Sequence, residues 1–107
     1  MNYGWALDFD CDKNLEEIMP FLNEHSQWKW IERDNDNLGF YTSSIGGFGF
    51  IVKIYYFYGD APNHPEYTLE VKIMDENHLE ESQIDLEVRK LLDQLEARNI
   101  RPGETYS

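Results

Sequence analysis

Hydrophobic and polar residues alternate over several short segments of the chain, and this two-residue period predicts strands with one buried face. The alternation is clearest at residues 3–9 and 67–73. Residues 50–58 are β-branched or aromatic almost throughout and predict the strongest strand. Residues 28–34 and 40–44 predict two more strands on either side of a turn-forming run, Asp-Asn-Asp-Asn. We therefore expect a sheet of about five strands.

Two other segments repeat their apolar residues every three or four positions, the period of a helix with one buried side. In the first segment, Asn14 and Glu17 form a capping-box pattern, which predicts a helix extending to about His25. Pro20 lies inside this segment and lacks the amide hydrogen that a helix interior uses. We therefore expect either a kink at Pro20 or a helix that begins later than the cap.

The second helical segment begins near Ser82, because Asp85 three residues later is typical of a helix N-terminus. We expect this helix to end near Asn99, before Pro102. The order of elements is then strand, helix, four strands and helix, in one domain that spans residues 1–107. Four consecutive strands with short turns favour an antiparallel sheet covered by both helices on one face, an α+β two-layer sandwich.

The sheet face away from the helices is a candidate binding surface. In the segment 50–58, the alternate set that contains Lys53 carries a charge, so we assign this set to the outer face. An exposed aromatic patch ringed by acids is typical of a protein–protein interface. Coverage by a loop, or by a second copy of the chain in a homodimer, is the alternative. The residues expected to lie side by side on this face are Ile51, Tyr55 and Phe57 with Glu66, Thr68 and Glu70.

Charge narrows the class of partner. The 107 residues include 21 acids against 9 Lys and Arg, which gives a formal charge of −12. Nucleic-acid binding requires a basic surface, and an anionic membrane repels an acidic one, so we expect neither. Between Lys72 and Arg89 there are acids but no Lys or Arg. Such a charge either keeps the protein soluble or attracts a basic protein partner.

The single cysteine and the N-terminal residues indicate a reducing compartment. Cys11 has no second cysteine to pair with, whereas secreted domains of this size usually carry several. The N-terminal residues lack the pattern of a signal peptide. The longest uncharged run, residues 38–52, is too short to span a bilayer. We therefore expect a soluble, cytoplasmic protein.

The residue patterns do not predict catalysis, a metal or a cofactor. Asp8, Asp10 and Asp12 follow a hydrophobic strand, but the chain is too short for a haloacid-dehalogenase-type phosphatase, and the later positions of an EF-hand loop are not filled. The three histidines lack the spacing of a zinc site. A nucleophilic pair of Cys11 with a histidine stays open, although neighbouring acids would raise the pKa of the thiol. We expect a protein that is not an enzyme.

Several positions also agree with a pattern found in small bacterial proteins, some of which resemble the immunity proteins of toxin–immunity pairs, including contact-dependent growth inhibition systems. The resemblance implies a cytoplasmic protein that binds and neutralises one cognate toxin domain, often a nuclease. The Trp and Gly positions also fit core anchors and a turn. The matching positions are Trp28-x-Trp30-x-x-Arg33-Asp34, Gly39-x-Tyr41, Val52-x-Ile54, Leu91-Leu92 and Ala97-Arg98.

The first hypothesis for function is therefore an immunity protein, a stoichiometric inhibitor of a basic toxin domain. Its acids would occupy the phosphate-binding cleft of the toxin while aromatic residues anchor the contact. The alternative is a phage-encoded nucleic-acid mimic, such as an anti-restriction or anti-CRISPR protein. We expect the partner-binding residues to cluster at one sheet face and its turns: Asp34, Asp36, Tyr55, Phe57, Asp60, Glu66 and Glu70.

Overall fold

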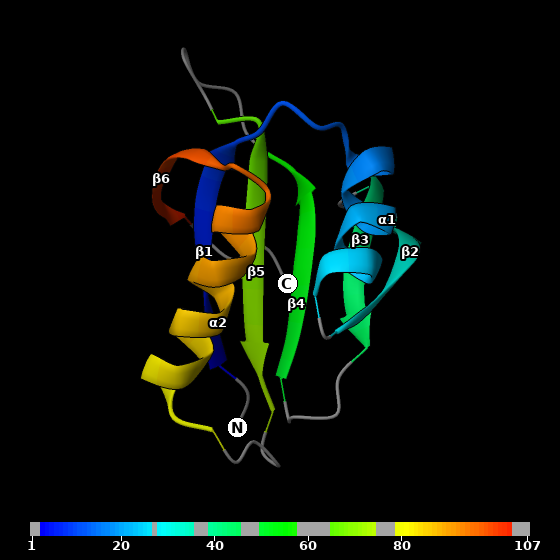
Figure 1. The fold of residues 1–107 in the computed structure, drawn as a ribbon. Helices are drawn as coiled ribbons and strands as arrows, with labels where there is room; N and C mark the ends of the chain where they lie inside the picture. The colour runs from blue at the N-terminus through cyan, green and yellow to red at the C-terminus, as the bar shows by residue number, and fades with distance from the viewer. Residues whose placement is uncertain are drawn as a thin grey trace.

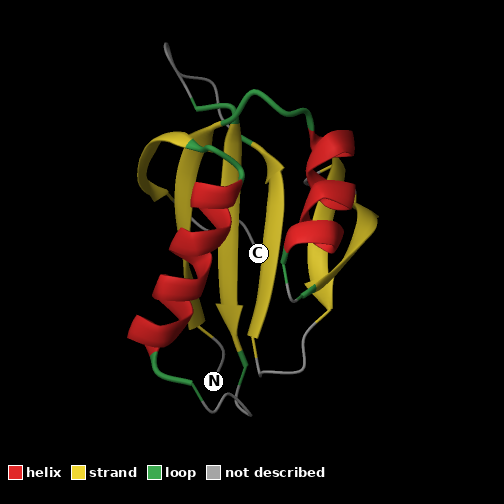
Figure 2. Ribbon diagram, in the orientation of Figure 1, coloured by secondary structure: helices red, strands yellow, loops and turns green. Residues whose placement is uncertain are grey.

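A computed structural model of the chain describes residues 3–26, 28–35, 39–45, 50–57, 65–74 and 79–103. Two helices lie against one face of a six-stranded antiparallel sheet, which confirms the predicted α+β two-layer sandwich (Figures 1 and 2). The elements in chain order are β1 (Tyr3–Asp10), α1 (Leu15–His25), β2 (Lys29–Asn35), β3 (Gly39–Ile45), β4 (Phe50–Tyr56), β5 (Tyr67–Ile73), α2 (Glu81–Gln94) and β6 (Arg98–Gly103).

The strands lie in the order β2-β3-β4-β5-β1-β6. Strands β2 to β5 form the predicted antiparallel meander. The first strand, β1, then pairs with β5, with Trp5 opposite Val71 and Phe9 opposite Tyr67. This register places the apolar residues of both strands on the same face, where the helices cover them.

The core lies between that face and the two helices. In Figure 1, α1 lies over β2 and β3, and α2 lies over β1 and β5. Each helix buries one apolar stripe against the sheet, as the three-to-four-residue spacing predicts. The side chains of the core include Leu7, Phe9, Val52, Ile54, Leu69 and Val71 from the sheet, and Ile18, Leu22, Ile84, Val88 and Leu92 from the helices.

Helix α1 begins where its cap predicts. The Asn14 Oδ1 accepts a hydrogen bond from the Glu17 amide at 2.9 Å, and the Glu17 Oε1 accepts one from the Asn14 amide at 3.1 Å. The helix continues through Pro20, so the expected later start is wrong. Pro20 is exposed, and water can therefore bind the carbonyl group that its missing amide leaves unpaired.

Helix α2 is shorter than predicted, and a sixth strand follows it. The helix ends at Gln94 rather than near Asn99, because Glu96 and Asn99 have left-handed φ values of 57° and 55°. The chain then turns back and forms β6 against β1. Strand β6 was not predicted because its residues, Arg-Asn-Ile-Arg-Pro-Gly, lack a regular apolar alternation.

Candidate functional site

The sheet face opposite the helices is polar, as predicted, but at its centre it is buried. The side chain of Tyr55 is 0% exposed and that of Glu70 is 1% exposed. Thr68 is also fully buried. The prediction that Tyr55 and Glu70 lie on an open surface is therefore wrong. Only one chain is present, so this burial arises within the chain and requires no second copy.

The buried polar groups of this face contact one another across β4 and β5. The β4–β5 register places Lys53 opposite Glu70 and Tyr55 opposite Thr68. The Lys53 Nζ lies 4.0 Å from the Glu70 Oε1, and the Tyr55 hydroxyl donates to the Glu70 Oε2 at 3.5 Å. Buried charges are tolerated when they are paired in this way.

The same arrangement continues onto β1 and β6. The Thr68 Oγ1 donates a hydrogen bond to the Asp8 Oδ1 at 2.8 Å. Strand β6 comes so close that a Cβ atom at Gly103 would lie 2.5 Å from the Asp8 Oδ1. A larger residue at position 103 would therefore require the Asp8 carboxylate to move. These contacts make Asp8, Thr68 and Glu70 part of the framework of the sheet.

The remaining predicted site residues lie toward one end of the sheet. Glu66 is exposed and Phe57 is half-buried, and the Phe57 amide donates to the Glu66 carbonyl at 3.0 Å. Asp34 lies in β2, opposite Phe40 of β3. The next residue of β3, Tyr41, pairs with Tyr55 near the end of β4. Asp36 and Asp60 lie outside the described residues. The structure therefore brings Phe57 and Glu66 together and places Asp34 at the same end, two strands away.

An exposed tyrosine at this end was not predicted. Tyr56 belongs to the alternate set that faces the helices, yet it is 48% exposed. Its ring stacks on Tyr67 at 5.4 Å, and Tyr67 stacks in turn on Phe9 at 5.5 Å. The Tyr67 hydroxyl donates to the Lys13 carbonyl at 2.8 Å, and this bond holds the middle ring of the three-ring stack in place. Tyr56 is therefore an exposed ring on a rigid support.

Two carboxylates lie close enough to these stacked rings to affect the pKa of Tyr67. Burial raises the pKa of the Tyr67 hydroxyl, and the nearby Tyr56, Cys11, Glu66 and Glu17 raise it further. Glu66 directly precedes β5 and Glu17 lies in α1, so they are far apart in the sequence but act on the same hydroxyl. Tyr67 consequently keeps its proton and remains a hydrogen-bond donor.

Asp10, at the end of β1, is held in a fixed orientation. Its Oδ1 accepts from the Glu66 amide at 2.9 Å, and its Oδ2 accepts from the Asn99 Nδ2 at 2.8 Å. The Asn99 hydrogen bond is the main cause that lowers the pKa of Asp10. Asp12 follows and contacts the Arg98 guanidinium at 2.7 Å, on the surface. Asp10 therefore stays charged down to acidic pH.

We call this region the acidic end of the molecule and define it by Asp10, Asp12, Glu16, Glu17, Tyr56 and Glu66. Figure 1 shows the end of β1, the start of α1, the end of β4 and the start of β5 together at the top of the view. The sequence contained one signal for it, since acids follow the β1 strand and also occupy the first turn of α1. The exposure of Tyr56 carried no such signal.

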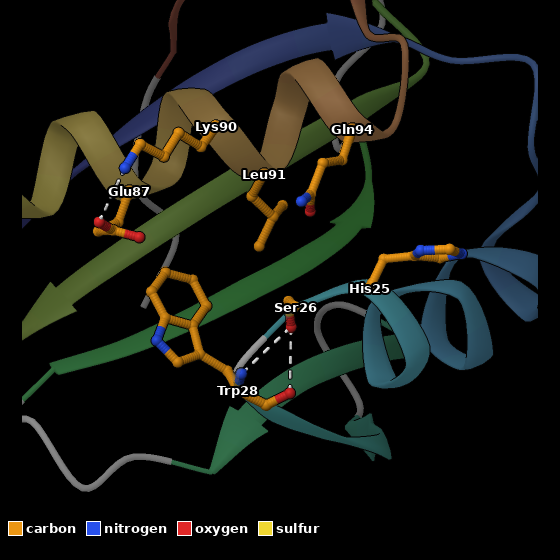
Figure 3. Close-up of a pocket in the computed structure, with 7 residues that line it drawn as sticks. All are labelled: His25, Ser26, Trp28, Glu87, Lys90, Leu91 and Gln94. Atoms are coloured by element: carbon orange, nitrogen blue, oxygen red, sulfur yellow. Dashed lines mark hydrogen bonds and ion pairs between the residues drawn. The ribbon is translucent and has the colours of Figure 1, made fainter.

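A pocket lies between the helices, where His25, Ser26 and Trp28 face α2 across a cavity of about 310 Å³ (Figure 3). The Ser26 Oγ accepts from the Trp28 amide at 3.2 Å and from the Trp30 indole at 2.9 Å, and these bonds fix one wall. His25 packs on Phe21, with ring centroids 4.3 Å apart. The opposite wall consists of Glu87, Lys90, Leu91 and Gln94, with an ion pair between Glu87 and Lys90 at 3.5 Å.

Cys11 is placed for packing rather than for nucleophilic attack. Its thiol is 1% exposed and donates to the Leu95 carbonyl at 3.3 Å. Burial raises the pKa of the thiol, so the reactive thiolate is suppressed. His25 contacts Phe21 instead, and the other two histidines lie outside the described residues. Within the described ranges, no group of three or more His, Cys, Asp or Glu side chains is arranged to hold a metal ion.

Comparison with known proteins does not assign this chain to a group. It matches no model of a known protein family and no curated protein. In the part of the chain that the structure describes, no helix is long and apolar enough to cross a bilayer.

Proposed function

We propose that this protein is an immunity protein that acts in the cytoplasm, where it neutralises a basic toxin domain, such as a nuclease, by binding it one to one through the acidic end. The observation that carries the proposal is the exposed Tyr56 ring, which is stacked on the buried Tyr67 beside Glu66 and Glu17. Aromatic residues on rigid supports are frequent energetic anchors of protein interfaces.

The carboxylates supply the charge complement to a basic partner. Asp10 is already ionised and oriented by its hydrogen bonds with Asn99 and Glu66, so it loses little conformational entropy on binding. A formal charge of −12 attracts a basic domain over a distance and speeds the encounter. Tyr56 would supply the short-range contact and the acids the steering.

The predicted partner-binding residues consequently take different roles in this proposal. Glu66 and Phe57 belong to the binding surface, and Asp34 extends it toward β2. Asp36 and Asp60 remain predicted contacts. Tyr55 and Glu70 instead hold the sheet together from its buried side.

Capture followed by titration tests the proposal. The protein is immobilised on a resin and incubated with lysate of the source organism at low salt. Bound proteins are then eluted with a salt gradient. We expect one basic protein, released only at high salt or by denaturant, whose toxic activity falls linearly to zero at one equivalent of inhibitor. A diffuse set of basic proteins, all released by modest salt, would show that the acidity serves solubility alone.

Competition separates this proposal from the nucleic-acid mimic. A mimic occupies the groove in which its target grips DNA or RNA, so excess duplex or guide RNA must displace it. An immunity protein bound outside the substrate groove resists that competition. Displacement of the protein from a restriction or CRISPR nuclease by nucleic acid would favour the mimic.

A further inference from the structure

The outer edge of β2 is the free edge of the sheet on the side of α1, and it is only half closed. Strand β2 pairs with β3 on one side and has no strand on its other side among the described residues. The Asn23 side chain of α1 closes part of this edge. Its Oδ1 accepts from the Trp30 amide at 2.7 Å, and its Nδ2 donates to the Trp30 carbonyl at 3.1 Å. Asn23 thus occupies the position where a neighbouring strand would bond to Trp30.

The alternation of an antiparallel strand shows which backbone groups remain open. The Ile31 carbonyl faces β3, where it accepts from the Thr42 Oγ1 at 3.2 Å. The backbone amide and carbonyl of Trp30 point away from β3, toward Asn23. Because this direction alternates along a strand, the backbone groups of Glu32 and Asp34 also point away from β3. Glu32 is exposed. The open half of the edge therefore runs from Glu32 to Asp34, toward the end of the sheet at which Tyr56 lies.

Two β2 edges do not fit one another at this half. Outward-facing residues pair with outward-facing residues in an antiparallel ladder. Any pairing of two β2 edges that avoids Asn23 then places Glu32 opposite Glu32 or Asp34, or Asp34 opposite Asp34. Like charges directly opposite one another destabilise a strand pair. A strand that carries Lys or Arg at those positions meets complementary charge instead.

We propose that the open half of β2 is a docking edge for an extended basic segment of the partner protein, which adds as an antiparallel strand beside Glu32 and Asp34 while Asn23 limits its length. The inference rests on the proposed function only in taking the partner to be basic. Main-chain hydrogen bonds would supply the contact, and the charge of Glu32 would select the partner.

A peptide titration followed by NMR tests the docking edge without the toxin. The probe is a ten-residue peptide of alternating lysine and valine, and the matched control peptide alternates glutamate and valine. We expect the basic probe, at up to millimolar concentration, to shift the amide signals of Glu32 and Asp34 and protect them from hydrogen exchange, while Trp30 is unaffected. Absence of these changes, or shifts confined to the acidic end, would overturn the inference.

Two substitutions separate strand pairing from charge attraction. Glu32→Pro removes an outward amide and leaves the β2–β3 ladder intact, so it should weaken the basic probe about fivefold. Glu32→Lys should reverse the preference toward the glutamate peptide. An amide spectrum otherwise like that of the native protein establishes that each variant is folded. Equal binding of both probes by the native protein and Glu32→Lys would contradict the role of charge.

The two proposals can fail separately. If the captured toxin binds and is inhibited while the Glu32 and Asp34 amides still exchange freely, the docking edge is wrong and the proposed function stands. If the basic probe protects these amides but no basic toxin is captured, the docking edge stands and the immunity function is wrong.

Discussion

The two faces of the sheet are both buried at the centre, but they are buried by different chemistry. On the helix side, residues such as Ile54 and Leu69 pack in one apolar cluster under α1 and α2. On the other side, Glu70 is equally inaccessible but lies among Lys53 and Tyr55, which contact its carboxylate. The comparison shows that a charge in an alternating strand identifies the face opposite the core, and does not show that this face is open to solvent.

The comparison also locates the surface available for binding. Side chains become more exposed on both faces at the end of the sheet, where β4 ends at Tyr56 and β5 begins after Glu66. Tyr56 is exposed there although it belongs to the apolar side. The proposed binding surface is therefore an end of the sandwich rather than a face.

The largest expected effect comes from the apolar face. Leu69→Ala removes a side chain with 0% exposure and leaves a cavity, so it should lower the free energy of unfolding by about 3 kcal/mol. Leu86→Ala is the control, because Leu86 is 56% exposed, and it should cost less than about 0.5 kcal/mol. Urea denaturation measures both. Similar losses for the two variants would contradict the assignment of the core.

The second effect distinguishes the polar face from the acidic end. Glu70→Ala removes the buried carboxylate that the Lys53 ammonium and the Tyr55 hydroxyl contact, so we expect a loss of about 2 kcal/mol in the free energy of unfolding. Glu66→Ala, at an exposed position, should change stability by less than about 0.5 kcal/mol. Urea denaturation of both variants measures the difference. If Glu70→Ala were as stable as the native protein, Glu70 would again be a candidate for contact with the partner.

The arrangement of the elements followed from the sequence more closely than the candidate site did. Alternation and capping located five strands and both helices, because those signals act between neighbours in the chain. Strand β6 was missed because it is stabilised by its pairing with β1, far away in sequence. The burial of Tyr55 and the exposure of Tyr56 depend on which elements cover each position, and alternation alone carries no information about coverage.

A smaller effect concerns acid stability at the junction of β1 and β6. The pKa of Asp10 is below its ordinary value of 3.8 in the folded protein, chiefly because Asn99 donates to its carboxylate. A lowered pKa contributes stability above the ordinary value, and that stability is lost as the pH falls through the folded value. Asp10→Asn should therefore make the unfolding free energy fall less steeply below about pH 4.

Acid titrations of unfolding, followed by circular dichroism, measure that slope. Asp93→Asn, which makes the same substitution at an exposed carboxylate in the last turn of α2, is the matched control. An Asp10→Asn slope identical to that of the native protein would show that the Asn99 hydrogen bond is not maintained in solution.

The next prediction concerns the reactivity of the Cys11 thiol rather than the stability of the fold. The thiol is buried against the Leu95 carbonyl and its pKa is raised, so a thiol reagent at neutral pH should modify the native protein far more slowly than the urea-unfolded chain. Rapid modification of the native protein would contradict this placement and return a reactive thiol to consideration.

The most direct test of the central claim is the affinity of the captured partner for surface variants at one fixed salt concentration. Tyr56→Ala should weaken binding about thirtyfold, and Glu66→Lys should weaken it and reduce its salt dependence. Asp93→Lys makes the same charge change as Glu66→Lys, on α2, and should alter the affinity less than about threefold. Equal losses at Glu66 and Asp93, with no loss at Tyr56, would contradict the assignment of the acidic end as the binding surface.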